Sequence, residues 1–272
     1  MTIPDPRPDR TCLVTGASSG IGVEIARLLA RRGHGVTVVA RSEDKLAQLA
    51  DELHTQYKVR AEYLAVDLSD AAARSGLPNA LAERGLSVDV LVNNAGFSTT
   101  GPVYQADPQA ELTMIRTNVE AVAHLCTLFL PAMVERHSGS VLNVASTVAF
   151  QPIAGQAGYA ASKSFVLSYT HGLRGELAGT GVTATALCPG PVRTGFAAAA
   201  GLDEQALDDT LPAFFWISAA DVAKAGIKAM DEDRAVVIPG VANRVTAGAG
   251  WLTPRRIVVP MMKKFHPVFK PK

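Results

Sequence analysis

The sequence is poor in cysteine and in net charge, and each shortage excludes a class of protein. Its three cysteines, Cys12, Cys126 and Cys188, form no CxxC pair. We therefore expect no disulfide framework and no metal site, and the chain suits a reducing compartment. The 272 residues include 26 lysines and arginines against 25 aspartates and glutamates, for a net charge of +1. Without a global basic field, a nucleic-acid partner is not expected.

Long hydrophobic runs are missing as well. No stretch reaches the roughly 18 consecutive apolar residues of a membrane span, because charges and prolines interrupt the most apolar region, at Arg244, Pro254, Arg255 and Arg256. The first ten residues, MTIPDPRPDR, are proline-rich and charged, with no apolar segment. They predict a short disordered lead over residues 1–10 instead of a secretory signal, and a cytoplasmic location.

The C-terminal extension, residues 241–272, mixes apolar and basic side chains. The mixed set comprises Trp251, Ile257, Val258, Val259, Met261 and Met262, together with Arg255, Arg256, Lys263 and Lys264. Two interpretations stay open. The extension either forms a helix packed on the domain, or an amphipathic helix that makes a weak contact with a membrane surface.

Between these ends, short β-branched apolar runs alternate with longer helical patterns. The runs are TCLVTG, VTVVA, AEYLAVD, VDVLVNN, SVLNVAS, VTATALCPG and AVVIPG. Such alternation predicts an α/β fold with a parallel sheet of about seven strands, covered by helices on both faces. The hydrophobic share of 48% is enough for a sizeable core. We therefore expect one doubly wound domain over residues 11–240.

A glycine-rich turn joins the first predicted strand to the first predicted helix. The segment TGASSGIG contains Gly16, Gly20 and Gly22 directly before a helix that begins near Ile21. At such a turn a Cβ would block approach of a pyrophosphate, while the helix N-terminus offers unpaired N–H groups. Glycines also serve in ordinary tight turns, so the triplet alone is weak evidence.

The spacing G-x-x-x-G-x-G resembles the cofactor turn of the classical short-chain dehydrogenases/reductases. The chain also has the Asn93-Asn94-Ala95-Gly96 turn after its fourth strand, and Asp67-Leu68 after its third, as that family does. The resemblance reaches to about Gly240 and implies a single Rossmann-like domain that binds a nicotinamide dinucleotide.

The end of the second strand indicates which nicotinamide cofactor is bound. An acidic residue there would bind the ribose 2'-hydroxyl of NAD, but this chain has Arg41 and Ser42. A guanidinium can pair with a 2'-phosphate, so NADP(H) is predicted. The alternative is that Arg41 is a solvated surface charge and Ser42 caps the next helix, a role compatible with phosphate binding.

Tyr159 and Lys163 stand four residues apart in a long helical pattern, so their side chains share one face. A phenol with a pKa of about 10 needs a nearby positive charge to act as an acid and base near neutral pH. An ammonium at roughly 4 Å would supply that charge. Such pairs also occur on ordinary helix surfaces, so the pair alone does not establish catalysis.

Ser146 ends the SVLNVAS strand, at the edge of the sheet where ligands bind in open α/β folds. The family resemblance then implies a catalytic tetrad. In it, Asn118 holds a water near Lys163, Ser146 positions the carbonyl, Tyr159 transfers the proton, and Lys163 lowers the pKa of Tyr159 and binds the nicotinamide ribose. Their alternative roles are a helix kink or cap for Asn118, a strand-end turn for Ser146 and a solvated charge for Lys163.

The segment Pro189-Gly190-Pro191-Val192-Arg193-Thr194 resembles the loop at which members of the family contact the nicotinamide amide through Val192 and phosphate through Thr194. A substrate lid is expected over residues 191–217. Its apolar side chains suggest a lipophilic substrate, although they could equally pack the lid onto the core; they are Phe196, Leu202, Leu207, Leu211, Phe214, Phe215 and Trp216. The predicted cofactor-binding residues are Gly16, Ser18, Ser19, Gly20, Ile21, Gly22, Arg41, Ser42, Asp67, Leu68, Asn94, Ala95, Gly96, Tyr159, Lys163, Pro189, Gly190, Val192 and Thr194.

Residues and resemblance together predict an NADP(H)-dependent oxidoreductase that moves hydride between the nicotinamide and a carbonyl or secondary alcohol, with reduction as the expected direction. The helical patterns at residues 111–136 and 155–177 resemble those through which family members form homodimers and homotetramers. Two other functions stay open. One is a non-enzymatic NADPH-binding sensor or scaffold, and the other is a peripheral membrane enzyme that reduces a lipid.

Overall fold

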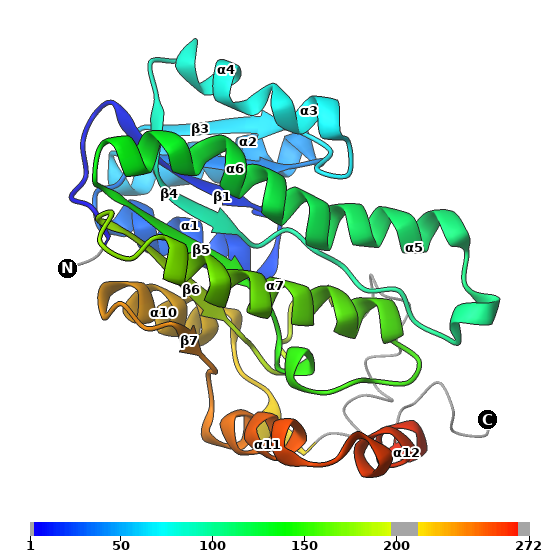
Figure 1. Cartoon of the computed structure of the whole chain (residues 1–272). Coiled ribbons are helices and arrows are strands. Elements are labelled where there is room, and N and C mark those ends of the chain that lie inside the picture. Colours follow the sequence, from blue (N-terminus) through cyan, green and yellow to red (C-terminus); the bar gives the residue numbers. More distant parts are fainter. Residues whose placement is uncertain (1–2, 197–211, 266–272) are drawn as a thin grey trace.

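The computed structural model describes residues 3–196 and 212–265, and within these ranges strands and helices alternate along the chain (Figure 1). The strands are β1 (Arg10–Thr15), β2 (Val36–Ala40), β3 (Ala61–Ala65), β4 (Ser87–Asn93), β5 (Gly139–Val144), β6 (Val182–Leu187) and β7 (Val236–Val237). They form one parallel sheet in the order β3-β2-β1-β4-β5-β6-β7. The strand order reverses between β1 and β4, the point where doubly wound sheets bind ligands. The predicted fold class is confirmed.

Helices cover both faces of this sheet (Figure 1). They are α1 (Gly20–Arg31), α2 (Glu43–Tyr57), α3 (Ala71–Ser75), α4 (Leu77–Ala82), α5 (Pro108–Ile115), α6 (Ala121–Glu135), α7 (Ala157–Glu176) and α10 (Ala219–Asp231). α1, α2 and α10 bury apolar side chains in one core cluster. α4, α6 and α7 bury theirs in a second cluster on the opposite face. Each sheet face therefore has its own core.

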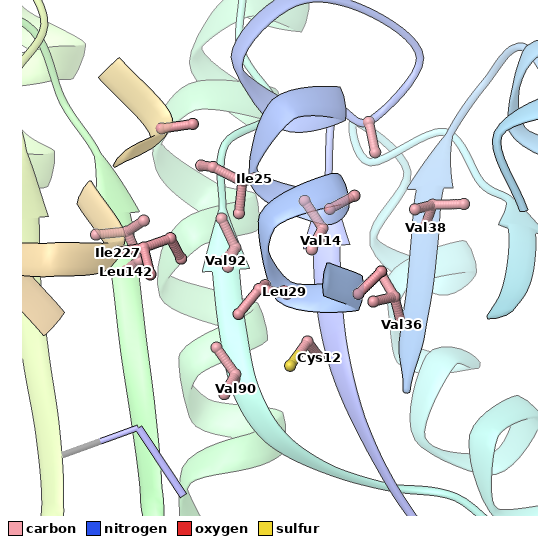
Figure 2. Close-up of a cluster of buried hydrophobic side chains, with 14 of the residues drawn as sticks. Cys12, Val14, Ile25, Leu29, Val36, Val38, Val90, Val92, Leu142 and Ile227 are labelled. Carbon is pink, nitrogen blue, oxygen red and sulfur yellow. The ribbon is translucent and has the colours of Figure 1, made fainter. Parts of the chain in front are cut away.

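The alternation of side chains along β1 divides the core between these two faces. Cys12 and Val14 point to the cluster of α1, where Figure 2 shows them beside Ile25 and Leu29. Leu13, between them in sequence, belongs to the opposite cluster. All three side chains are at most 1% exposed. This strand is buried on both faces, which is why its sequence is a continuous apolar run.

Both ends of the chain differ from the prediction. The lead predicted to be disordered contributes the buried side chain of Ile3 to the core, and Arg10 is already the first residue of β1. At the other end, the predicted strand AVVIPG forms only the two-residue β7. The C-terminal extension continues as α11 (Val241–Leu252) and α12 (Arg255–Phe265).

One continuous helical stretch, Pro108–Glu135, is long and apolar enough by composition alone to cross a membrane. It consists of α5, a π-helical turn (Arg116–Glu120) and α6. In the fold, Leu125 and Met133 of α6 are at most 1% exposed and pack in the core beside the sheet. A core helix of an α/β domain has this composition for the same reason as a spanning helix, since both must match apolar surroundings.

Arg74 on α3 is a charged side chain with no exposed surface. Its guanidinium donates to the carbonyl oxygen of Leu68 at 2.5 Å, donates to His124 Nδ1 at 3.2 Å, and pairs with the carboxylate of Glu120. Leu68 lies in the loop after β3, and Glu120 ends the π-helical turn. Arg74 therefore joins two segments that both flank the carboxyl end of the sheet.

We predict that Arg74→Met lowers the free energy of unfolding by about 2–4 kcal/mol, because it leaves the buried Leu68 carbonyl without its donor and removes the buried partner of Glu120. Urea unfolding monitored by circular dichroism measures the loss. Arg60→Met is the control, since Arg60 is an exposed arginine that also pairs with a glutamate, Glu62, and its loss should cost about 1 kcal/mol or less. Equal losses in the two variants would contradict the role of Arg74.

Candidate active site

The glycine turn after β1 adopts a conformation and a packing that exclude side chains. Gly16 and Gly20 have φ angles of +65° and +59°, in the left-handed region. A Cβ on Gly16 would lie 2.7 Å from Ala95 Cα, and a Cβ on Gly22 would lie 2.5 Å from the carbonyl oxygen of Gly16. Both distances are too short for real contacts, so the sequence must have glycine here.

The N-terminus of α1 follows this turn directly. Ser19 occupies the N-cap position, but its side chain makes no capping hydrogen bond, and the first turn holds no acidic residue. Ser18 is half-buried, and Ile21 packs partly on the core. Free N–H groups and the positive end of the helix dipole therefore face the turn, an arrangement that suits a pyrophosphate. The glycine-lined cradle fits the predicted dinucleotide.

The Asn94-Ala95-Gly96 turn after β4 is held against the glycine turn by hydrogen bonds. Asn94 Nδ2 donates to the carbonyl oxygens of Thr15 at 2.9 Å and Gly16 at 3.2 Å. The Thr15 hydroxyl accepts from the backbone N–H groups of Asn94 and Ala95, each at 3.0 Å, and donates to the Val92 carbonyl at 3.1 Å. Two turns 79 residues apart thus form one unit.

The loop of residues 189–194, which follows β6, packs against the glycine turn. A Cβ on Gly20 would lie 2.9 Å from Thr194 Cβ, so Thr194 contacts the glycine turn, and its contact with phosphate stays a prediction. The Pro189 carbonyl accepts from the hydroxyl of Ser146 at 3.3 Å and from the N–H of Thr147 at 2.9 Å. The loop therefore contacts both the expected phosphate cradle and the expected catalytic serine.

The residues predicted to select the cofactor lie at the ends of β2 and β3. Arg41 is exposed, and its charge acts on Asp67. Burial alone would raise the pKa of Asp67, but hydrogen bonds from Ser69 and the charge of Arg41 outweigh it and lower that pKa. Ser42 is at the N-cap position of α2 without a side-chain capping hydrogen bond, so the cap named as its alternative role is not formed. The Leu68 side chain is buried in the core and its carbonyl oxygen accepts from Arg74, so its contact with the cofactor stays a prediction.

Asn118 lies within the π-helical turn between α5 and α6 and is fully buried. Its Oδ1 accepts from the N–H of Phe97 at 3.1 Å, and its Nδ2 donates to the carbonyl of Phe97 at 2.9 Å and the hydroxyl of Ser162 at 3.1 Å. A Cβ on Gly96 would lie 2.9 Å from Asn118 Oδ1 and 3.2 Å from Lys163 Nζ. The Asn118 side chain therefore holds the Gly96 turn beside Lys163. Its predicted role toward a water molecule stays a prediction.

Ser146 and Tyr159 meet at the carboxyl end of β5. Ser146 caps a 3-10 turn (Thr147–Phe150) by accepting from the N–H of Val148 at 3.3 Å. Its hydroxyl lies close enough to Tyr159 to lower the pKa of that phenol. Both side chains are 8% exposed. The predicted serine and tyrosine are thus neighbours, although 13 residues separate them in sequence.

Lys163 is 4% exposed, and its Nζ lies 5.9 Å from the centre of the Tyr159 ring and donates to the Val144 carbonyl at 2.9 Å. Burial lowers the pKa of Lys163 to about 8. Burial also raises the pKa of Tyr159 to about 12, against the opposing effect of the Ser146 hydrogen bond. The expected lowering of the Tyr159 pKa by Lys163 is therefore not found in this structure, because desolvation disfavours both charged forms.

The two ends of the predicted lid are joined to each other. Val192 pairs with Ile217 in a parallel bridge, and the N–H of Ile217 donates to the Pro191 carbonyl at 3.1 Å. The ring of Phe196 lies 5.7 Å from that of Tyr159, centre to centre. An aromatic side chain thus stands directly beside the phenol. Leu202, Leu207 and Leu211 lie outside the described residues.

Two residues that support the site had no distinctive signal in the sequence. In the sequence Thr15 is only the residue before the glycine turn, and its hydrogen bonds to the Asn94 turn can be recognised only once the fold is known. Asn243 on α11 is 2% exposed and packs against Gly190, where a Cβ would lie 2.4 Å from its Oδ1. Among the described residues, no cluster of three or more histidine, cysteine or acidic side chains could hold a metal ion.

Solved structures of other proteins share this fold. A short-chain dehydrogenase from Sphingobium yanoikuyae in complex with NADPH matches with a TM-score of 0.79 and 33% identity, over 89% of this chain and 92% of that one. An actinorhodin polyketide ketoreductase with NADPH matches with a TM-score of 0.78 and 33% identity, over 90% of this chain and 99% of that one.

Sequence comparison agrees. An uncharacterised oxidoreductase from Staphylococcus saprophyticus is 36% identical over 68% of this chain and 80% of its own length. A very-long-chain 3-oxoacyl-CoA reductase from Anas platyrhynchos is 36% identical over 67% of this chain and 59% of its own length. The family model described as short chain dehydrogenase matches residues 10–205. These residues contain the glycine turn, the Asn94 turn and all four tetrad positions, and the chain belongs to the short-chain dehydrogenase family.

Proposed function

We propose that this protein is an NADP(H)-dependent oxidoreductase that reduces a lipophilic ketone or aldehyde to the alcohol. The observation that carries the proposal is the meeting of Ser146, Tyr159 and Lys163 beside the glycine turn. NADPH supplies the hydride when it is bound. The protein must then supply a proton to the resulting alkoxide and keep the carbonyl oxygen close to that proton.

Each side chain has a distinct part in this reaction. Ser146 donates a hydrogen bond to the substrate oxygen, and the neighbouring Tyr159 transfers the proton. Lys163, held by the Val144 carbonyl, binds the nicotinamide ribose beside Tyr159. A phenol whose pKa is raised to about 12 by burial keeps its proton at neutral pH, so Tyr159 enters the reduction in its acid form.

The cofactor is NADP(H) because Arg41 stands where an acidic residue would bind the 2'-hydroxyl of NAD. The solved Sphingobium yanoikuyae dehydrogenase and the actinorhodin ketoreductase, both similar to this chain, were determined with NADPH. These relatives support the same preference.

A lipophilic substrate is supported by the surroundings of Tyr159. The aromatic ring of Phe196 lies beside it, at 5.7 Å between ring centres. A bulky-bulky ketone specific alcohol dehydrogenase from Comamonas testosteroni matches with a TM-score of 0.74 and 28% identity. The bulky ketones named for that enzyme, and the very-long-chain acyl substrate named for the 3-oxoacyl-CoA reductase, are apolar. An apolar active site would suit substrates of this kind.

The enzyme is proposed to be a cytoplasmic homodimer or homotetramer. Exposed apolar side chains on α5 and α7, Leu112 and Phe165, support an interface along these helices. The three cysteines are buried and unpaired, which suits a reducing compartment.

Tyr159→Phe should reduce turnover by about 100- to 10,000-fold, because it removes the proton donor. The measurement is NADPH absorbance with a panel of hydrophobic ketones and aldehydes, alongside NADPH binding by fluorescence. Binding should persist in the variant. Tyr169→Phe is the control on the same helix and should retain activity. If the wild-type protein binds NADPH tightly yet reduces no carbonyl, the proposal fails in favour of a non-enzymatic NADPH sensor.

Arg41→Gln should raise the KM for NADPH by about tenfold, since an exposed guanidinium–phosphate contact contributes roughly 1.4 kcal/mol. The KM for NADH should not change, because NADH has no 2'-phosphate. Arg7→Gln, at another exposed arginine, serves as the control. A parallel rise in both KM values would indicate that Arg41 acts on the fold and not on the phosphate.

Lys163→Met should abolish turnover yet increase stability at pH 7. The pKa of Lys163 in the folded protein is lowered to about 8 from 10.5. Below pH 8 the buried ammonium therefore lowers the free energy of unfolding by a few kcal/mol. This destabilisation decreases as the pH rises from 8 to about 10.5. The stability gain of the variant should therefore be largest at pH 7 and smaller at pH 9.5 in urea unfolding. A gain that does not depend on pH would exclude this explanation.

A further inference from the structure

The two helices that follow β7, α11 and α12, differ in how their sides are covered. One side of α11 packs on the body of the enzyme, and the opposite side is exposed. On α11, Asn243, Ala247 and Gly250 are buried. A Cβ on Gly250 would lie 2.3 Å from Gln151 Oε1, so this side packs against the turn that carries Ser146. The helix is thus anchored to the body of the enzyme.

The opposite side of α11 is apolar and exposed. Val241, Val245 and Leu252 follow the i, i+4, i+11 spacing of a single helical stripe. Trp251 stands next to this stripe, and on α12 Ile257 and Met261 repeat the i, i+4 spacing. These six side chains are between 46% and 78% exposed. A soluble helix normally has polar residues on the side away from the core, so this stripe requires an explanation.

The charged residues of this region are all basic. Residues 235–272 contain seven lysines and arginines and no aspartate or glutamate, whereas the whole chain has a net charge of +1. The first 234 residues therefore carry a net charge of −6. Arg244 and Arg256 are exposed beside the apolar stripe. Arg255 is also exposed, and it bonds the Phe150 carbonyl at 3.1 Å, which ties α12 to the body.

We infer that the outer side of α11 and α12 docks on an anionic lipid bilayer. Apolar side chains flanked by basic ones, with a tryptophan at the boundary, are the features by which an amphipathic helix lies in a membrane interface. The acidic remainder of the chain would be repelled from anionic lipid, so the charge asymmetry sets one orientation. A second copy of the chain is a poorer fit, because a two-fold contact would bring the same basic residues close to each other.

This docking sets where the active site lies. Figure 1 shows α11 and α12 together at one end of the molecule, away from α3 and α4. The inner side of α11 contacts Gln151 and Gly190, from the segments that follow Ser146 and β6. The catalytic loops would therefore stand about one helix diameter, roughly 10 Å, from the lipid surface.

The test is flotation of the full-length protein with phosphatidylcholine vesicles that contain or lack phosphatidylglycerol. The protein should float only with the anionic vesicles, and less as salt is raised. Arg244→Gln with Arg256→Gln should weaken binding about 25-fold, or about fivefold for each charge, and Trp251→Ala should weaken it further. Lys224→Gln with Lys228→Gln removes two exposed lysines of α10 and should leave binding unchanged.

Three results would overturn the inference. They are no flotation with either vesicle, equal flotation with both, or equal losses in the α11–α12 variants and the α10 control. Sedimentation velocity of the same proteins identifies a contact between copies, since Trp251→Ala would then reduce the assembly without any vesicle binding. Reductase activity on a dissolved carbonyl is recorded in parallel. It should not change in these variants, so failure of docking and failure of the proposed reaction can be distinguished.

Discussion

A buried ammonium at the carboxyl end of β5 is the constraint around which the site is organised. Lys163 is 4% exposed, and its Nζ is held by the carbonyl oxygen of Val144 at 2.9 Å. Burying a cation disfavours its charged form, which is why its pKa falls to about 8. The fold tolerates this position because a large hydrophobic core on each sheet face supplies the stability that the site lacks.

The surroundings of Lys163 consist of close backbone approaches that depend on small residues. Gly96 brings the turn after β4 against both Lys163 and Asn118, and Gly16 and Gly22 bring the turn after β1 against Ala95 and Asn94. These turns extend from β1 and β4, the pair of strands at which the sheet order reverses. The reversal leaves room at the strand ends, and the glycines let the backbone of both turns line it. The turn after β4 therefore contacts the catalytic residues on one side and the glycine turn of the cofactor site on the other.

The fold and the family could be predicted from sequence because their signals are local. Each strand of a parallel sheet is buried on both faces and reads as an apolar run, as TCLVTG does, and the glycine spacing lies within seven residues. The prediction was weaker wherever a residue's role depends on distant partners. Arg74 reads as an ordinary helix charge, yet it is buried because Leu68, Glu120 and His124 surround it.

The acid–base chemistry could be predicted only in part, for a related reason. The spacing of Tyr159 and Lys163 indicates that they share a helix face, but it contains no information on how deeply that face is buried. Desolvation reverses the direction expected for the pKa of Tyr159. The ends of the chain show the same limit, since Ile3 reaches the core although nothing in MTIPDPRPDR is periodic.

The C-terminal helices lie between the active site and the lipid bilayer proposed to contact their outer side. α11 packs its buried side on the loops that follow Ser146 and β6, through Gly250 against Gln151 and Asn243 against Gly190. Asn243 Nδ2 also donates to the carbonyls of Phe215 at 3.1 Å and Pro239 at 3.2 Å, and Phe215 lies within the predicted lid. A shift of α11 would therefore move a lid residue and the Gly190 loop together. Since packed interiors transmit small displacements instead of absorbing them, the position of α11 is part of the geometry of the active site.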